Sequence, residues 1–245
     1  MQDQLTKIVK EIFESKYPDA HLIFLAGSLV RGEGTSYSDL DLVVIFDKLP
    51  NAHRESFHFQ NFPVEAFVHD PETLNYFLYK IDRPSGIPSL AQMILEGIEI
   101  PQSDEMSQSL KQLATKVIQL RPPPLSDEDI SKLRYNITNL VDDIREPRSE
   151  DELIAVGTEL YGALADYYFR TNKLWSARGK SIPRILKQAD AELFRRYCNS
   201  FAELFTSSQP AKVIALVEEI LKPSGGFLFD GHRLDAPADW REPLA

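Results

Sequence analysis

The sequence predicts an α+β protein, in which an N-terminal domain with a small mixed β-sheet flanked by helices precedes an all-α helical bundle. Short runs of aliphatic and β-branched residues, typical of strands, occur between residues 21 and 69. The proline-rich segment RPPPL at residues 121–125 is typical of a stiff linker. From Ser126 onward, apolar residues recur at helical spacing. We therefore expect one domain over residues 1–121 and a second over residues 122–245, which ends in an irregular tail.

The first half of the chain alternates between helix and strand signals. Apolar residues from Leu5 to Phe13 recur at helical spacing, and Pro18 ends this helix. The apolar run HLIFLA predicts a buried strand that enters a turn at Gly27-Ser28, and a loop with two glycines follows. Further strands are expected at residues 39–46, 53–60 and 62–69, and further helices at residues 71–81, 89–96 and 104–120.

The second half carries helix signals alone. Ser126 is a favourable N-cap, and the acidic residues Glu128 and Asp129 follow in the first turn, where the helix dipole favours negative charge. The expected helices cover residues 127–146, 150–171, 183–205 and 210–221. The segment after residue 222 is rich in proline and glycine and is expected to cross the surface without regular structure.

Composition excludes several classes of function. Cys198 is the single cysteine, so intramolecular disulfides and cysteine-rich metal sites are excluded. The 27 basic and 37 acidic residues give a formal net charge of -10, which argues against an extended nucleic-acid surface. No apolar run is long enough to span a membrane, and no signal peptide is visible at the N-terminus. We expect a cytoplasmic protein that binds neither nucleic acid nor a membrane.

Three carboxylates form the strongest functional signal. Asp39 and Asp41 are two residues apart in a predicted strand, so both side chains project from the same face. Such a pair is costly in apolar surroundings unless a cation neutralises it. Oxygen donors without histidine or cysteine neighbours favour Mg²⁺. Glu65 is an isolated acid in the apolar segment VEAFV, which a neighbouring strand would bring beside the pair.

The turn at Gly27-Ser28 supplies a complementary signal. A glycine between a strand and a helix lets the backbone approach a phosphate closely, and the following amides and hydroxyl group can bind it. Together, a metal site and a phosphate-binding turn predict an enzyme of phosphoryl or nucleotidyl transfer.

The segments GSLVR at residues 27–31 and YSDLD at residues 37–41 resemble the signature of the DNA polymerase beta-type nucleotidyltransferase superfamily. Within it, they are most similar to the kanamycin (aminoglycoside) nucleotidyltransferases, which differ in having glutamate where this chain has Asp41. The resemblance implies that Asp39, Asp41 and Glu65 hold two Mg²⁺ ions. It also implies that Gly27, Ser28, Arg31 and Ser38 contact the phosphates of ATP or another nucleoside triphosphate.

The resemblance further implies a general base on an early helix of the second domain. A helical wheel of residues 127–146 places Asp143 on the flank of the apolar stripe and Asp142 nearly opposite the core, which favours Asp143. Glu159 and Asp166 on the next expected helix remain competitors.

A triphosphate would need a cation from the second domain. Lys180, which follows Gly179 in a cluster of basic residues, is the first choice.

These inferences lead to an expected enzyme that transfers AMP from ATP to a hydroxyl group of a small molecule, such as an aminoglycoside-like antibiotic. The acceptor is expected between the domains, and a homodimer is the quaternary structure that the resemblance suggests. Two alternatives remain open: an antitoxin-type nucleotidyltransferase that modifies a protein hydroxyl, and a non-catalytic nucleotide-binding regulator.

Overall fold

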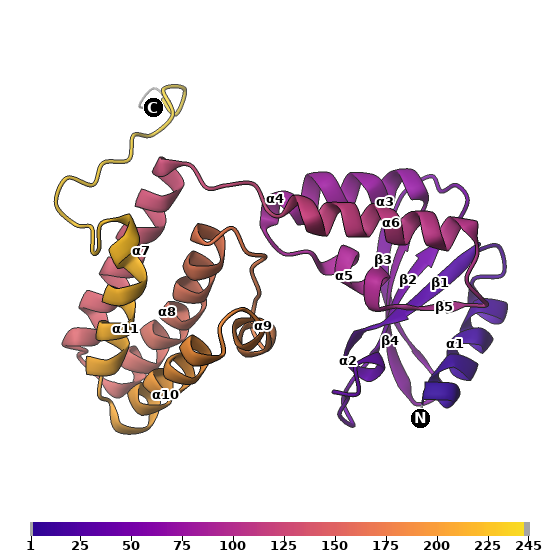
Figure 1. Cartoon of the computed structure of the whole chain (residues 1–245), viewed down its shortest axis with the longest axis horizontal. Coiled ribbons are helices and arrows are strands. Elements are labelled where there is room, and N and C mark those ends of the chain that lie inside the picture. The colour runs from indigo at the N-terminus through magenta and orange to yellow at the C-terminus, as the bar shows by residue number, and fades with distance from the viewer. Residues whose placement is uncertain (1, 243–245) are drawn as a thin grey trace. The chain divides into compact units, whose positions relative to one another are not determined.

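The computed structural model describes residues 2–242, and the chain divides into two compact units, Met1–Pro123 and Pro124–Ala245 (Figure 1). Within the described residues, the first unit contains a five-stranded sheet and the second contains helices without strands. The predicted fold class, a mixed sheet with helices followed by a helical bundle, is confirmed. Among residues 2–242, none of the helices combines the length and apolar character that crossing a bilayer requires.

The sheet of the first unit has the strand order β3-β4-β2-β1-β5. Strands β2 and β4 are parallel, and each of the other neighbouring pairs is antiparallel. Its strands are β1 (Leu22–Ala26), β2 (Leu40–Ile45), β3 (His53–Phe59), β4 (Phe62–His69) and β5 (Ile98–Ile100). The helices of this unit are α1 (Gln2–Lys16), α2 (Gly27–Val30), α3 (Pro71–Phe77), α4 (Arg83–Ser85), α5 (Ser89–Glu96) and α6 (Glu105–Leu120), with a π-helical turn at Leu78–Asp82.

The two faces of this sheet have different environments. Alternate residues of β1, β2 and β4, including Leu25, Leu42 and Ala66, pack with α1 in one buried cluster. On the opposite face, α5 lies against β1 and β2, and Gly97, directly after α5, lies against Phe24. Neighbouring side chains on a strand point to opposite faces of the sheet. Because the apolar residues in this cluster point toward α1, the residues between them along each strand point to the opposite face.

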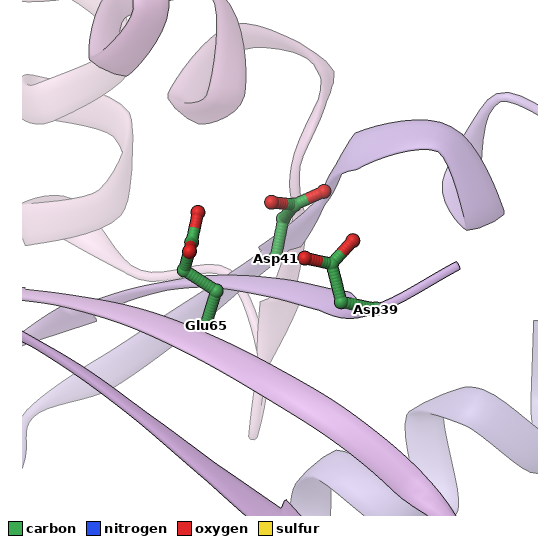
Figure 2. A group of neighbouring side chains, drawn as sticks. All are labelled: Asp39, Asp41 and Glu65. Carbon is green, nitrogen blue, oxygen red and sulfur yellow. The ribbon is translucent and has the colours of Figure 1, made fainter. Parts of the chain in front are cut away.

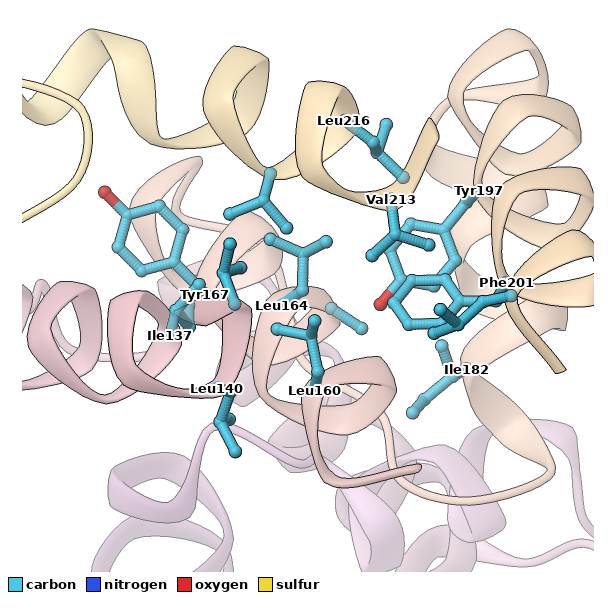
Figure 3. Close-up of a cluster of buried hydrophobic side chains, with 14 of the residues drawn as sticks. Ile137, Leu140, Leu160, Leu164, Tyr167, Ile182, Tyr197, Phe201, Val213 and Leu216 are labelled. Atoms are coloured by element: carbon cyan, nitrogen blue, oxygen red, sulfur yellow. The ribbon is translucent and has the colours of Figure 1, made fainter. Parts of the chain in front are cut away.

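The second unit is a bundle whose buried cluster joins all of its long helices (Figure 3). Tyr197, Phe201 and Leu164 are among its fully or almost fully buried members. The helices are α7 (Asp127–Arg145), α8 (Glu150–Thr171), α9 (Ser181–Ala189), α10 (Ala191–Ser207) and α11 (Ala211–Leu221), followed by a 3₁₀ turn at Lys222–Ser224. As predicted, Ser126 caps α7, and its hydroxyl accepts a hydrogen bond from the Asp129 amide at 3.1 Å.

One predicted helix is wrong. The expected helix over residues 183–205 is two helices, α9 and α10, which meet at Asp190. The Asp190 carboxylate accepts hydrogen bonds from the backbone amides of Glu192 (3.0 Å) and Leu193 (2.9 Å). An aspartate in this role starts a new helix, because it satisfies amides that have no intrahelical partner.

Residues 225–242 form no helix or strand, as expected for the tail, and the first part of this segment contacts α7. The Arg134 guanidinium donates a hydrogen bond to the Gly226 carbonyl at 2.9 Å. The Thr138 hydroxyl accepts one from the Leu228 amide at 2.9 Å, and the ring of Tyr135 stacks on His232 at 4.0 Å between centroids. These contacts hold residues 226–232 of the tail against α7.

Candidate active site

The three acidic residues that the sequence singles out lie together in the first unit. Asp41 on β2 and Glu65 on β4 are direct neighbours across the parallel pair, and Asp39 lies two residues before Asp41. One carboxylate oxygen from each residue lies within 4.8 Å of the others. Figure 2 shows the three carboxylates on one side of the two strands. The side chains are half-buried. This arrangement follows from strand alternation, because the intervening Leu40 and Leu42 are buried in the cluster with α1.

Gly27 has a steric role at this site. Its φ angle is 84°, a left-handed conformation that favours glycine. A Cβ atom at this position would lie 1.9 Å from Oδ2 of Asp41, because the preceding residue, Ala26, is the cross-strand partner of Asp41. The turn therefore requires glycine both for its backbone conformation and for the position of the Asp41 carboxylate.

We expect Gly27→Ala to destabilise the first unit and to displace Asp41. Gly32→Ala is a matched control, because Gly32 also has a positive φ of 74° but has open space where a Cβ atom would lie. The control should lose about 1 kcal/mol of unfolding free energy from backbone strain alone. Gly27→Ala should lose more and should also weaken binding of divalent cations, measured by titration with Mn²⁺. Equal losses in the two variants would contradict the steric role.

The loop between β1 and β2 connects two predicted phosphate-binding residues. The Ser28 hydroxyl donates to the Ser38 hydroxyl oxygen at 3.2 Å, and the same Ser38 oxygen accepts from the Thr35 amide at 2.9 Å. Ser38 thus links the loop to the turn and directly precedes Asp39. The two serine hydroxyls therefore lie within hydrogen-bonding distance of each other.

Glu96, which the sequence reasoning did not single out, contacts the Gly27-Ser28 turn from the end of α5. Its Oε1 atom accepts hydrogen bonds from the Gly27 amide at 3.1 Å and from the Arg31 guanidinium at 2.5 Å. Arg31 also pairs with Glu33 at 2.9 Å. The resemblance implies a phosphate contact for Arg31, and in this structure its guanidinium is paired with these two carboxylates. Glu96 is a lone acid at the end of the apolar helix α5. The sequence alone does not indicate its role, because its contacts depend on the position of α5 beside the turn.

Asp82 anchors the other end of α5. Its carboxylate is buried and accepts a hydrogen bond from the Leu90 amide at 2.8 Å. Burial raises the pKa of Asp82 to about 6, although hydrogen bonds from the Leu90 and Ala91 amides act in the opposite direction. Helix α5 is therefore fixed by a carboxylate at each end, and Asp82 makes this anchor sensitive to pH.

Asp82→Asn is expected to change how stability depends on pH. Because the folded-state pKa lies above the unfolded value, the folded state binds the proton more tightly, and stability falls as pH rises from about 4 to 6. Above pH 6, the charged Asp82 carboxylate therefore lowers the unfolding free energy by up to about 3 kcal/mol. Burial lowers the pKa of His69 to about 4, and this shift acts in the opposite direction over a similar range.

The quantity to compare is therefore the difference in unfolding free energy between the variant and the parent at each pH. Chemical denaturation at pH 4 and pH 7 should show Asp82→Asn gaining on the parent as pH rises, since asparagine retains an acceptor for the Leu90 amide. A difference that is independent of pH would contradict a raised pKa at Asp82.

The remaining predicted residues belong to the second unit. Asp143 lies near the end of α7, and both Asp143 and Asp142 are exposed, with Asp142 paired to Arg145 at 3.2 Å. Lys180 is exposed and directly precedes α9. Of the competing bases on α8, Glu159 is exposed, whereas Asp166 accepts a hydrogen bond from the Ser176 hydroxyl at 2.5 Å.

Residues 6–96 match the family model of the nucleotidyltransferase domain. The matched segment begins in α1 and ends at Glu96, so it includes the three acids and the Gly27-Ser28 turn. The first unit therefore contains the segment that matches a nucleotidyltransferase domain, and the protein is an enzyme that transfers phosphorus-containing groups. The match supports the predicted resemblance at the level of the superfamily.

Among solved structures, a nucleotidyltransferase-like protein from Exiguobacterium sibiricum is similar to the chain at 13% sequence identity and a TM-score of 0.44. The similarity covers 90% of this chain and 75% of that protein. No curated protein shows a significant match to the chain.

The donor set at the three acids fits divalent magnesium. Asp39, Asp41 and Glu65 offer only carboxylate oxygens, which are the hard ligands that Mg²⁺ prefers. Their spacing allows one ion to contact more than one carboxylate, and their half-buried position leaves room for the waters and phosphate oxygens that Mg²⁺ retains.

Proposed function

We propose that the protein is a Mg²⁺-dependent nucleotidyltransferase that transfers AMP from ATP to a hydroxyl group of a small molecule. The observation that carries this proposal is the convergence of three carboxylates within 4.8 Å in the domain matched by the family model. The glycine turn supports it, because Gly27 packs against the Asp41 carboxylate and is followed directly by Ser28, whose hydroxyl contacts Ser38.

The three acids, the two serines and Gly27 of the first unit have proposed roles. Asp39, Asp41 and Glu65 would hold two Mg²⁺ ions. Bound Mg²⁺ would lower the pKa of the acceptor hydroxyl and neutralise charge on the pyrophosphate leaving group. Ser28 and Ser38 donate hydrogen bonds to phosphate oxygens, and Gly27 allows the backbone to approach them.

The second unit is proposed to supply the remaining groups. Asp143 accepts the proton of the acceptor hydroxyl, and Lys180 contributes positive charge to the triphosphate. A cationic acceptor such as an aminoglycoside suits the net charge of -10. A homodimer is the assembly proposed for this enzyme.

The test is a screen of hydroxyl-bearing compounds, including aminoglycosides, with labelled ATP and Mg²⁺. Pyrophosphate release should depend on the acceptor, and the label should appear on that compound. The Asp39→Asn variant is the control for contaminating activity. Transfer of the label to a protein would favour the antitoxin-type alternative. Binding of Mg·ATP without any pyrophosphate release would favour a nucleotide-binding regulator.

A further inference from the structure

An arginine on the edge strand of the sheet contacts the third carboxylate. The Arg54 guanidinium on β3 forms an ion pair with Oε1 of Glu65. Arg54 is the cross-strand partner of Phe67, which lies two residues after Glu65 on β4, so all three side chains share one face of the sheet. This is also the face of Asp41, the direct neighbour of Glu65.

A second contact holds the guanidinium in place. Its central carbon lies 5.1 Å from the centroid of the Phe67 ring, within the range of a cation–π interaction. The Arg54 side chain is 60% exposed, whereas the Glu65 side chain is 22% exposed. The arginine therefore reaches from the solvent side of the sheet to a partly buried carboxylate and rests on an aromatic ring.

The pairing matters because Glu65 belongs to a cluster of like charges. Three carboxylates whose oxygens lie within 4.8 Å repel one another, and a guanidinium on one of them offsets part of that repulsion. A divalent cation would offset more of this repulsion, because it carries twice the charge and can contact all three carboxylates. Arginine and cation thus compete for Glu65.

We propose that Arg54 is a positioning residue that holds the Glu65 carboxylate until a divalent cation takes its place. The proposal rests on the proposed function, because it requires a cation at the three acids. Arg54 then lowers the affinity of the nucleotide-free site for divalent cations while keeping Glu65 in its place on the sheet.

The test is titration of the nucleotide-free, full-length protein with Mn²⁺, following free Mn²⁺ by electron paramagnetic resonance. Arg54→Gln should bind Mn²⁺ more tightly, with a Kd lower by about threefold to tenfold, the range expected for one partly exposed ion pair. Arg54→Lys, which retains the charge, should bind nearly as weakly as the parent. A merely structural role would not produce a gain in affinity that lysine reverses.

Lys48→Gln is the matched control for the change in net charge. Lys48 is an exposed cation that pairs with Glu72 at 2.6 Å. It follows the C-terminal end of β2, whereas Asp41 lies near the N-terminal end of that strand. Its loss should change the Kd for Mn²⁺ by less than about twofold, because solvent screens charges at this range. An equal gain from Lys48→Gln would overturn the specific role of Arg54.

A double variant separates competition at Glu65 from a general effect of charge. In a Glu65→Gln background, measured at higher Mn²⁺ concentration, adding Arg54→Gln should change the Kd far less than it does in the parent. If the full gain persists, Arg54 acts on the cation without Glu65, and the inference is wrong.

The failure of this inference is distinguishable from the failure of the proposed function. If the parent binds Mn²⁺ and Asp39→Asn removes the binding, but Arg54→Gln binds no more tightly than the parent, only the role of Arg54 is overturned. If Mn²⁺ binding is absent, or is the same in the parent and Asp39→Asn, the metal site itself is overturned, and the role of Arg54 with it.

Discussion

Asp39→Asn should abolish most of the rise in melting temperature that ATP with Mg²⁺ produces in the parent. A ligand at one hundred times its Kd stabilises the folded state by about 2.7 kcal/mol, which corresponds to several degrees for a domain of this size. Turnover should fall by about 10³-fold, because a metal ligand contributes several kcal/mol to the transition state. Thermal melts with and without Mg·ATP, together with pyrophosphate release, measure both effects.

The protein without ligand provides the control for this prediction. Asp39→Asn should be as stable as the parent or more stable, since one of three neighbouring negative charges is removed. A large loss of stability without ligand would mean that Asp39 supports the fold instead. A variant that is stabilised by Mg·ATP like the parent would exclude Asp39 as a metal ligand.

Asp143→Asn should lower turnover by about 10² to 10⁴-fold, the usual contribution of a positioned general base. Mg·ATP binding should be nearly unchanged, because the role proposed for Asp143 is toward the acceptor hydroxyl, whereas the residues proposed to hold metal and phosphate are the three acids, Ser28, Ser38 and Lys180. The loss should appear mainly in kcat, since proton transfer is an interaction of the transition state. Steady-state kinetics with an identified acceptor, combined with thermal melts, separate the two quantities.

The neighbouring residue is a matched control for the base. Asp142 is also exposed and lies on the same helix, where it pairs with Arg145, and Asp142→Asn should have little effect on turnover. If Asp143→Asn retains near-normal turnover while Glu159→Gln or Asp166→Asn does not, the base lies on α8. Asp166 would then have to exchange its hydrogen bond with Ser176 for one with the acceptor.

The elements that define the fold class were predictable because their signals are local. The hairpin of β3 and β4 follows from two strand patterns on either side of a short turn, where Gln60 has a positive φ of 52°. The grouping of Asp39 and Asp41 follows from strand alternation alone. Placing Glu65 beside them needed only the assumption that its strand is a neighbour, and the parallel pairing of β2 and β4 meets that assumption.

The features that sequence reasoning missed depend on non-local contacts. Strand β5 is three residues long and is defined by its pairing with β1 rather than by its own pattern. Glu96 and Arg54 look like ordinary charged residues until the position of α5 and the register of β3 are known. Asp190 carried a local signal, since aspartate is a favoured N-cap, but the continuous apolar pattern around it concealed the break between α9 and α10.

The parallel pairing of β2 and β4 has a consequence for how the enzyme acquires activity during folding. The hairpin of β3 and β4 is local in sequence and of a kind that forms within microseconds. Asp41 and Glu65, in contrast, meet only after β4 of this hairpin has docked beside β2, a contact that closes a longer loop than the hairpin turn does and carries a larger entropic cost. The cation site is therefore complete only when β4 has paired with β2. During refolding, recovery of cation binding would report on this docking step, whereas strand content alone would also report on the hairpin.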